Sequence, residues 1–136
     1  MYELAVRGGF AAAHNLRDYK GKCEHIHGHN YIVEAVFECA GLQKNGLGVD
    51  FGILKESLNT VLEGLDHKYL NKDVEYFRKN NTSAENIAFY VFGSLEKRVK
   101  GAKLVKVGVW ESENAKATYS RPCVAAPVTR KKRGRR

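Results

Sequence analysis

The 136-residue sequence lacks long hydrophobic runs and is poor in cysteine. No segment approaches the roughly 18 consecutive apolar residues that a membrane-spanning helix needs. The first residues (MYELAVRGG) lack the basic stretch followed by an apolar stretch that is typical of a secretory signal peptide. Three cysteines, far apart in the chain, do not form a disulfide framework. We therefore expect no membrane association, a cytoplasmic location and cysteines that stay reduced.

Positive charge is concentrated at the C-terminal end. The formal net charge is +8, and because six positive charges lie in residues 130–136 (RKKRGRR), the rest of the chain carries only +2. A basic segment of this kind is expected to be solvated and disordered, although it can also bind nucleic acid by releasing counterions. We therefore predict one domain over residues 1–122, large enough for a hydrophobic core, and a disordered basic tail over residues 123–136.

Alternating apolar residues predict four strands. The clearest alternation places Tyr31, Val33, Ala35, Phe37 and Cys39 on one face of a strand. A bulge is expected at Gly8-Gly9, because glycine within a strand often marks one. The four predicted strands cover residues 2–13, 29–39, 103–111 and 115–121.

Two helices are predicted between the second and third strands. Apolar residues at helical spacing indicate a helix over residues 51–65, followed by a loop of mixed polarity. The segment Thr82-Ser83-Ala84-Glu85 has the form of a capping box with Thr82 as the N-cap, and it opens a second helix that ends near Gly101. This order predicts an α+β fold, with a four-stranded antiparallel sheet and both helices on one face.

Histidines are clustered where the first two strands meet. Four of the five lie between positions 14 and 29. His27 and His29 are two residues apart at the start of a strand, so their imidazoles project to the same face, and His14 at the end of the preceding strand offers a third. Three nitrogen ligands with one open position are typical of a catalytic zinc. His25 precedes the strand and is interpreted as a loop residue.

Cys23 lies four residues before His27 and offers two chemistries. A thiol close to a divalent cation has a lowered pKa and serves as a base or nucleophile. Alternatively, a thiolate could be a fourth metal ligand and close a structural site. Cys39, on the apolar face of its strand, is expected to be a core residue, and Cys123 has no evident role.

Two further positions carry candidate chemistry. Asp66-His67 joins a carboxylate to an imidazole after a helix, and such a pair can tune a proton carrier near neutral pH; helix capping or plain surface polarity is the alternative. Glu111 is in phase with the valines of its strand. An unpaired buried carboxylate is costly, so Glu111 either has a cationic or multi-donor partner, such as an amino-heterocycle, or lies in solvent beyond the strand.

Several segments together resemble the 6-pyruvoyltetrahydropterin synthase superfamily. The resemblance runs from about residue 2 to residue 121 with its landmarks in order. The three-residue gap between Cys23 and His27 is similar to that of the bacterial 6-carboxytetrahydropterin synthase branch. The matching segments are residues 10–14 (FAAAH), 23–30 (CEHIHGHN), 66–67 (DH), 82–86 (TSAEN) and 110–111 (WE).

The resemblance implies a ββααββ tunnelling fold (T-fold) that oligomerises into a β-barrel. It implies a homo-hexamer, a dimer of trimers, whose interfacial active sites bring Asp66 and His67 to the Cys23 of another chain. It further implies zinc bound by three histidines and a pterin anchored by Glu111, with added contacts from the segment at the start of the second helix. The implied zinc ligands are His14, His27 and His29, and the added contacts are Thr82 and Ser83.

The implied reaction converts 7,8-dihydroneopterin triphosphate to 6-carboxy-5,6,7,8-tetrahydropterin, with release of triphosphate and acetaldehyde, on the route to queuosine. Cys23 would remove a proton, and Asp66 with His67 would move protons on the opposite side. Lys22, with Lys20 and Arg17, is the candidate to hold the triphosphate.

Two alternatives remain open. The first alternative is a 6-pyruvoyltetrahydropterin synthase or another dihydroneopterin side-chain lyase, because some members use a glutamate near the position of Glu24. A structural-zinc module that binds RNA through its basic tail is the second.

Overall fold

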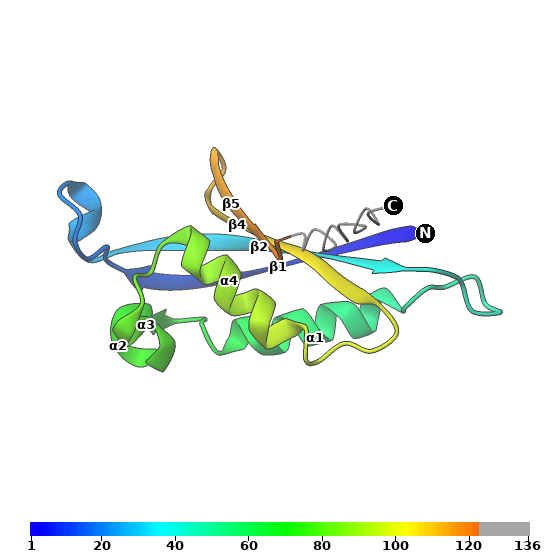
Figure 1. Ribbon diagram of the computed structural model, residues 1–136. Helices are drawn as coiled ribbons and strands as arrows, with labels where there is room; N and C mark the ends of the chain where they lie inside the picture. Colours follow the sequence, from blue (N-terminus) through cyan, green and yellow to red (C-terminus); the bar gives the residue numbers. More distant parts are fainter. Residues whose placement is uncertain (123–136) are drawn as a thin grey trace, which may run out of the picture.

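The computed structural model describes residues 1–122 and is built on one five-stranded sheet (Figure 1). The strands are β1 (Tyr2–His14), β2 (His27–Cys39), β3 (Lys68–Tyr69), β4 (Lys103–Ser112) and β5 (Ala115–Ser120). Their order is β3-β1-β2-β4-β5. The four longer strands pair antiparallel, as expected, and β3 adds a short parallel pairing to the edge of β1.

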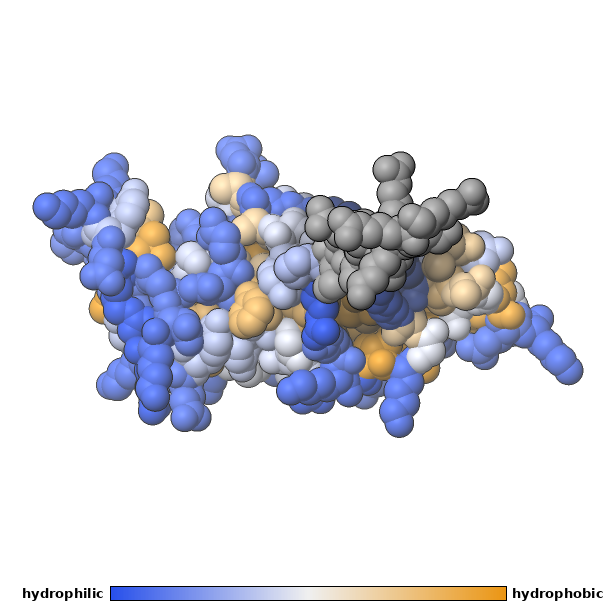
Figure 2. Space-filling model, in the orientation of Figure 1, coloured by the Kyte–Doolittle hydropathy of each residue, from blue (hydrophilic) through white to orange (hydrophobic). Residues whose placement is uncertain are grey.

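One face of the sheet carries the core. On β2 the alternating residues Tyr31, Val33, Ala35 and Phe37 are fully buried, and Cys39 is buried at the end of the same row. The helices α1 (Phe51–Glu63) and α4 (Ala84–Leu95) cover this face (Figure 1). The α+β architecture predicted from the sequence is therefore confirmed. The face seen in Figure 2 is mostly hydrophilic with scattered hydrophobic patches, as expected when the large apolar side chains lie between sheet and helices.

Each long helix begins at a side-chain cap. The Asp50 carboxylate accepts a hydrogen bond from the Gly52 N–H at 2.7 Å and starts α1. The α4 helix begins after Ser83, whose hydroxyl oxygen accepts from the Asn86 N–H at 3.2 Å. The predicted cap, Thr82, lies one residue too early, because its hydroxyl is used inside the protein, as described below.

The segment between α1 and α4 has more structure than the predicted loop. After β3 it forms α2 (Leu70–Asp73) and α3 (Glu75–Lys79). Leu70 and Phe77 are fully buried and attach these short helices to the core. A further short 3-10 helix, η1 (Lys22–Glu24), lies in the loop that joins β1 to β2.

The predicted bulge at Gly8-Gly9 is wrong. Pairing between β1 and β2 runs without a shift from Tyr2 to His14. Gly8 instead allows close packing of α1, because a Cβ there would lie 2.8 Å from Asn59 Oδ1 and 3.0 Å from Leu62 Cδ1. Irregular pairing occurs on β4 instead. Its register shifts against β2 at Val36-Phe37 and against β5 between Trp110 and Ser112.

None of the helices within residues 1–122 combines the length and apolar character required to cross a bilayer. The predicted disordered tail, with Cys123, lies outside the described residues.

Candidate metal centre

Three histidines meet at one end of the sheet. His14 is paired with His27 across β1 and β2, and His29 lies one step further along β2, opposite Ala12. Because paired residues and residues two apart share a face, all three rings project from the core face of the sheet. One ligand atom from each histidine lies within 4.8 Å of the others. The structure thus brings together the three residues that the sequence pattern selected.

Backbone carbonyls fix the tautomers of two of these rings. His14 Nδ1 lies 2.8 Å from the Thr82 carbonyl oxygen, and His27 Nδ1 lies 2.7 Å from the His25 carbonyl oxygen. A carbonyl only accepts hydrogen bonds, so each Nδ1 must carry the proton. In the neutral rings the Nε2 lone pairs of His14 and His27 then face one another at 3.0 Å. Such an arrangement is repulsive until a cation lies between them.

His29 completes the set. Its Nε2 is a buried atom without a hydrogen-bond partner, and it lies 3.4 Å from Glu111 Oε1. Burial lowers the pKa of His14 and of His29, and in both cases it outweighs the opposing attraction of Glu111. Both rings are therefore neutral at pH 7, which is the form that binds a metal.

This donor set fits a divalent metal ion. Three imidazoles, two of them held by a carbonyl behind the ring, are the usual environment of a catalytic zinc and also suit other first-row divalent ions. Cys23 is not part of this three-histidine group. The geometry therefore favours an open site over the structural site that a fourth, thiolate ligand would close.

Glu111 lies at the irregular end of β4. The register of β4 against β5 shifts between Trp110 and Ser112, and the carboxylate of Glu111 reaches back to His29 across the core face. Its side chain is 29% exposed. The carboxylate therefore lies beside the histidine group rather than free in solvent, and part of it is accessible to a ligand.

The loop carrying Cys23 extends beyond the ends of β1 and β2 (Figure 1). Cys23 is partly exposed in η1, and its carbonyl oxygen accepts a hydrogen bond from the Leu16 N–H at 2.8 Å. Lys22 and Lys20 are exposed in the same loop. Arg17 differs, because its guanidinium donates to the carbonyl oxygens at the end of α3, those of Phe77, Arg78 and Asn80. Arg17 is thus committed to the fold and not free to hold a triphosphate.

Asp66 and His67 do contact one another. Asp66 Oδ2 lies 2.8 Å from His67 Nδ1, and Asp66 Oδ1 accepts from the Ala11 N–H at 2.9 Å. That backbone hydrogen bond, with help from His67, lowers the pKa of Asp66. His67 has a left-handed backbone (φ 56°), and its side chain is 83% exposed. The pair is an imidazole backed by a carboxylate and turned outward.

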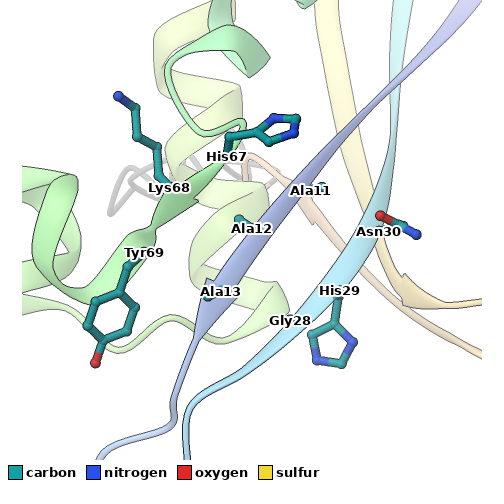
Figure 3. A pocket seen from close by; sticks show the side chains of 9 residues that line it. All are labelled: Ala11, Ala12, Ala13, Gly28, His29, Asn30, His67, Lys68 and Tyr69. Atoms are coloured by element: carbon teal, nitrogen blue, oxygen red, sulfur yellow. The ribbon is translucent and has the colours of Figure 1, made fainter.

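The His67 imidazole and the histidine group lie on different sides of β1. Figure 3 shows His67 beside the outer edge of β1 and His29 on β2, with β1 between them. Both line one open cavity of about 500 Å³, whose other lining residues come from β1, β2 and β3. Within one chain, therefore, His67 presents its free nitrogen to the outside.

Thr82 faces the protein interior. The residue is fully buried, and its hydroxyl lies 3.1 Å from the Asn15 carbonyl oxygen, to which it donates. This burial argues against the expected side-chain contact between Thr82 and a substrate. Sequence reasoning missed the contact that Thr82 does make with His14, because a backbone carbonyl leaves no signature in the residue type. The neighbouring Ser83 is half-buried and caps α4.

Comparison with known proteins assigns the chain to a family. The family model described as 6-pyruvoyl tetrahydropterin synthase matches residues 3–122. The chain is 36% identical to the 6-pyruvoyl tetrahydrobiopterin synthase of Drosophila melanogaster, over 88% of this chain and 79% of that protein. It is 34% identical to a putative 6-carboxy-5,6,7,8-tetrahydropterin synthase of Archaeoglobus fulgidus (87% and 95%). It is 35% identical to a dihydroneopterin monophosphate aldolase of Pyrococcus furiosus (79% and 88%).

Solved structures agree with this assignment. The Caenorhabditis elegans 6-pyruvoyl tetrahydropterin synthase superposes with a TM-score of 0.81 at 30% identity, over 89% of this chain and 96% of that one. The Plasmodium vivax 6-pyruvoyl tetrahydropterin synthase gives a TM-score of 0.70 at 26% identity (90% and 98%). A variant of the P. vivax protein, in which alanine replaces a glutamate described as catalytic, also matches. From the match over residues 3–122 and the shared fold, this chain belongs to the 6-pyruvoyl tetrahydropterin synthase family.

Proposed function

We propose that this protein is a zinc-dependent lyase that converts 7,8-dihydroneopterin triphosphate to 6-carboxy-5,6,7,8-tetrahydropterin, releasing triphosphate and acetaldehyde. Its product would enter queuosine and deazapurine synthesis. The observation that carries the proposal is the pair of carbonyl contacts that turn His14 and His27 so that their Nε2 lone pairs converge. A site built only to pack histidines has no need of two such lone pairs at 3.0 Å.

His14, His27 and His29 would hold the metal, which supplies acidification of the substrate's side-chain hydroxyls and the neighbouring C–H bonds. The burial of His14, together with the two carbonyl contacts, keeps the first two rings in one orientation. Such preorganisation supports catalysis because little rearrangement is needed when a substrate arrives.

Glu111 is proposed to anchor the pterin. A carboxylate accepts two parallel hydrogen bonds from an amino-heterocycle, which gives orientation as well as affinity. Because Glu111 Oε1 is 3.4 Å from His29 Nε2, a ring bound on this carboxylate would lie beside the histidine group. Ser83, half-buried at the start of α4, remains a candidate for an added contact.

Cys23 is proposed as the base that removes a proton from the substrate side chain, and exposed Lys22 beside it as a contact for the triphosphate. The Asp66-His67 pair is proposed to transfer protons at the Cys23 of a neighbouring chain in a homo-hexamer. The exposure of His67 supports this, since its free nitrogen is turned outward and accessible to a partner.

The choice of product rests on the residues of the Cys23 loop. Relatives named for three different activities are almost equally similar to this chain, at 36%, 34% and 35% identity. The thiol at Cys23 and its short distance in sequence from His27 favour the 6-carboxy product. The exposed Glu24 favours the alternative, a 6-pyruvoyl synthase or a related dihydroneopterin side-chain lyase, because the P. vivax relative has a glutamate described as catalytic.

The test combines product identification with the variant C23A. We expect the wild-type protein to bind zinc and to form 6-carboxytetrahydropterin, identified by mass spectrometry. We expect C23A to keep its zinc and to lose about 10²–10⁴-fold in turnover, the usual contribution of a general base. Loss of zinc in C23A would make the thiol a ligand, and 6-pyruvoyl product alone from the wild type would rule out the 6-carboxy assignment.

A further inference from the structure

The four residues that begin at His14 are held by two asparagine side chains. Asn71 Oδ1 accepts from the Asn15 N–H at 3.0 Å, and Asn71 Nδ2 donates to the Asn15 carbonyl oxygen at 2.8 Å. Asn81 repeats the arrangement on Arg17, accepting from its N–H at 3.0 Å and donating to its carbonyl oxygen at 2.9 Å. An amide side chain can satisfy both backbone groups of one residue, as a neighbouring strand would. We call these two contacts the asparagine clamps.

The clamps connect directly to the His14 ring. Thr82 follows Asn81 in sequence, and the Thr82 N–H donates to Asn81 Oδ1 at 3.1 Å. The Thr82 hydroxyl donates to the Asn15 carbonyl oxygen at 3.1 Å, which joins the two clamps. The Thr82 carbonyl oxygen is the acceptor for His14 Nδ1. The orientation of this carbonyl, and with it the tautomer of His14, is therefore set by groups whose position depends on Asn71 and Asn81.

The same segment also holds the loop of Cys23. Between the two clamped residues lies Leu16, whose N–H donates to the Cys23 carbonyl oxygen at 2.8 Å. The clamps hold the residues on either side of Leu16, and Leu16 holds Cys23. One short segment thus relates His14 to Cys23.

We propose that Asn71 and Asn81 are positioning residues that align His14, the proposed metal ligand, with Cys23, the proposed catalytic base. The proposal rests on the proposed function, in which His14 binds zinc and Cys23 acts on the substrate. Without a clamp, the Thr82 carbonyl can rotate, and the His14 ring loses the contact that keeps the proton on Nδ1. Loss of a partner behind a metal ligand typically weakens metal binding by about 10–100-fold.

The test compares the variants N71A and N81A with N80A. Asn80 lies in the same region and also donates from its side chain to a backbone carbonyl, that of Tyr76 at 2.9 Å, but it does not contact the 14–17 segment through its side chain. N80A is therefore a matched control for the loss of one asparagine. Zinc affinity is measured by competition with a chelator, and alkylation of Cys23 in the metal-free protein is followed by peptide mass spectrometry.

We expect N71A and N81A to bind zinc about 10–100-fold more weakly and to expose Cys23 to faster alkylation, with N80A at wild-type values for both. If either clamp variant does not fold, T82V replaces it, because this change removes only the hydroxyl that joins the clamps; weaker zinc binding in T82V supports the proposal. Clamp variants indistinguishable from N80A in both measurements overturn it. A wild-type protein that binds no zinc overturns the proposed metal site itself, a different result.

Discussion

His14 is the most deeply buried of the three histidines, with 1% of its surface exposed. Its ring has the Thr82 carbonyl on one side and the Nε2 atom of His27 on the other. At the scale of single residues, the arrangement of the three rings therefore depends on groups outside the three histidines. The carbonyls of Thr82 and His25 decide which nitrogen of His14 and His27 is free, and Glu111 lies beside the third ring.

The first prediction concerns pH and the metal-free protein. Burial lowers the folded-state pKa of His14 and His29 below the value of 6.5 for an exposed histidine. On acidification the unfolded chain therefore takes up protons before the folded protein does. We expect the free energy of unfolding to be at its full value above about pH 6.5 and to fall as the pH is lowered towards 5.

Urea unfolding of the metal-free protein at pH 7.5, 6.5 and 5.5 tests this expectation. The variant H14Q removes one of the two groups and should show a smaller loss between pH 7.5 and 5.5. Asp66 does not interfere. Its pKa is lowered in the folded protein, so its contribution to stability is fully present between pH 7.5 and 5.5 and is lost only at more acidic pH. Stability that stays constant or rises between pH 7.5 and 5.5 would contradict the assignment of buried, neutral histidines.

At the scale of elements, periodicity predicted the long strands and helices but not the short ones. The apolar alternation of β2 and the helical spacing of α1 repeat several times, so each pattern is clear in the sequence. The helices α2 and α3 have four and five residues, and each buries only one, Leu70 or Phe77. A single buried residue defines no period. These elements depend on tertiary packing and could not be predicted locally.

In the candidate site, too, some residues could be predicted from a sequence pattern and others could not. The spacing of His27 and His29 on a strand, with His14 at the end of the previous one, was enough to select the three histidines that the structure brings together. Asn71 and Asn81, whose contacts lead to the His14 ring, lie 57 and 67 residues after His14 in the sequence. Their side chains bind backbone groups, and that kind of contact has no sequence pattern.

The second prediction concerns the packing of α1 on β1. A Cβ at Gly8 would lie 2.8 Å from Asn59 Oδ1 and 3.0 Å from Leu62 Cδ1. The amide of Asn59 is exposed and can swing away, whereas Leu62 is buried and cannot. We expect G8A to lower the free energy of unfolding by about 1 kcal/mol, the lower end of the usual cost of overpacking. Strand propensity favours alanine over glycine by less than this.

The matched control is G28A in the neighbouring strand. A Cβ at Gly28 would meet only the Ala12 carbonyl oxygen, at an ordinary 3.5 Å. Denaturant unfolding of both variants without metal should place G28A at or slightly above the wild-type stability and G8A below it. Equal stability of the two variants would mean that α1 is not packed tightly against Gly8.

At the scale of the whole molecule, the sheet ends in an incomplete edge. The two residues of β3 pair with β1 only at Ala12 and Ala13. At Ala11 the His67 N–H donates to the carbonyl oxygen, and the Asp66 carboxylate accepts from the N–H. The rest of β1 has no strand on that side within residues 1–122. Unpaired edges are where sheets join. The proposed homo-hexamer, if its chains join as the β-barrel that the family resemblance implies, would cover this edge and bring the exposed His67 against a neighbour.

The third prediction tests whether Cys23 and His67 act together across two chains. C23A and H67A should each be inactive, or nearly so, as pure assemblies. If the subunits are mixed under conditions that allow exchange, about one quarter of the interfaces in a symmetric oligomer will combine an intact Cys23 with an intact His67. We therefore expect the mixture to recover about one quarter of the wild-type activity. If the site is formed within one chain, every site in a mixed assembly still lacks either Cys23 or His67, and no activity would return.

The double variant C23A/H67A, mixed with either single variant, is the control and should remain inactive in both cases, because no pairing in that mixture restores both residues. Recovery in the first mixture and not in the second would place the two halves of the site on different chains, whereas activity absent from both would assign Cys23 and His67 to the same chain.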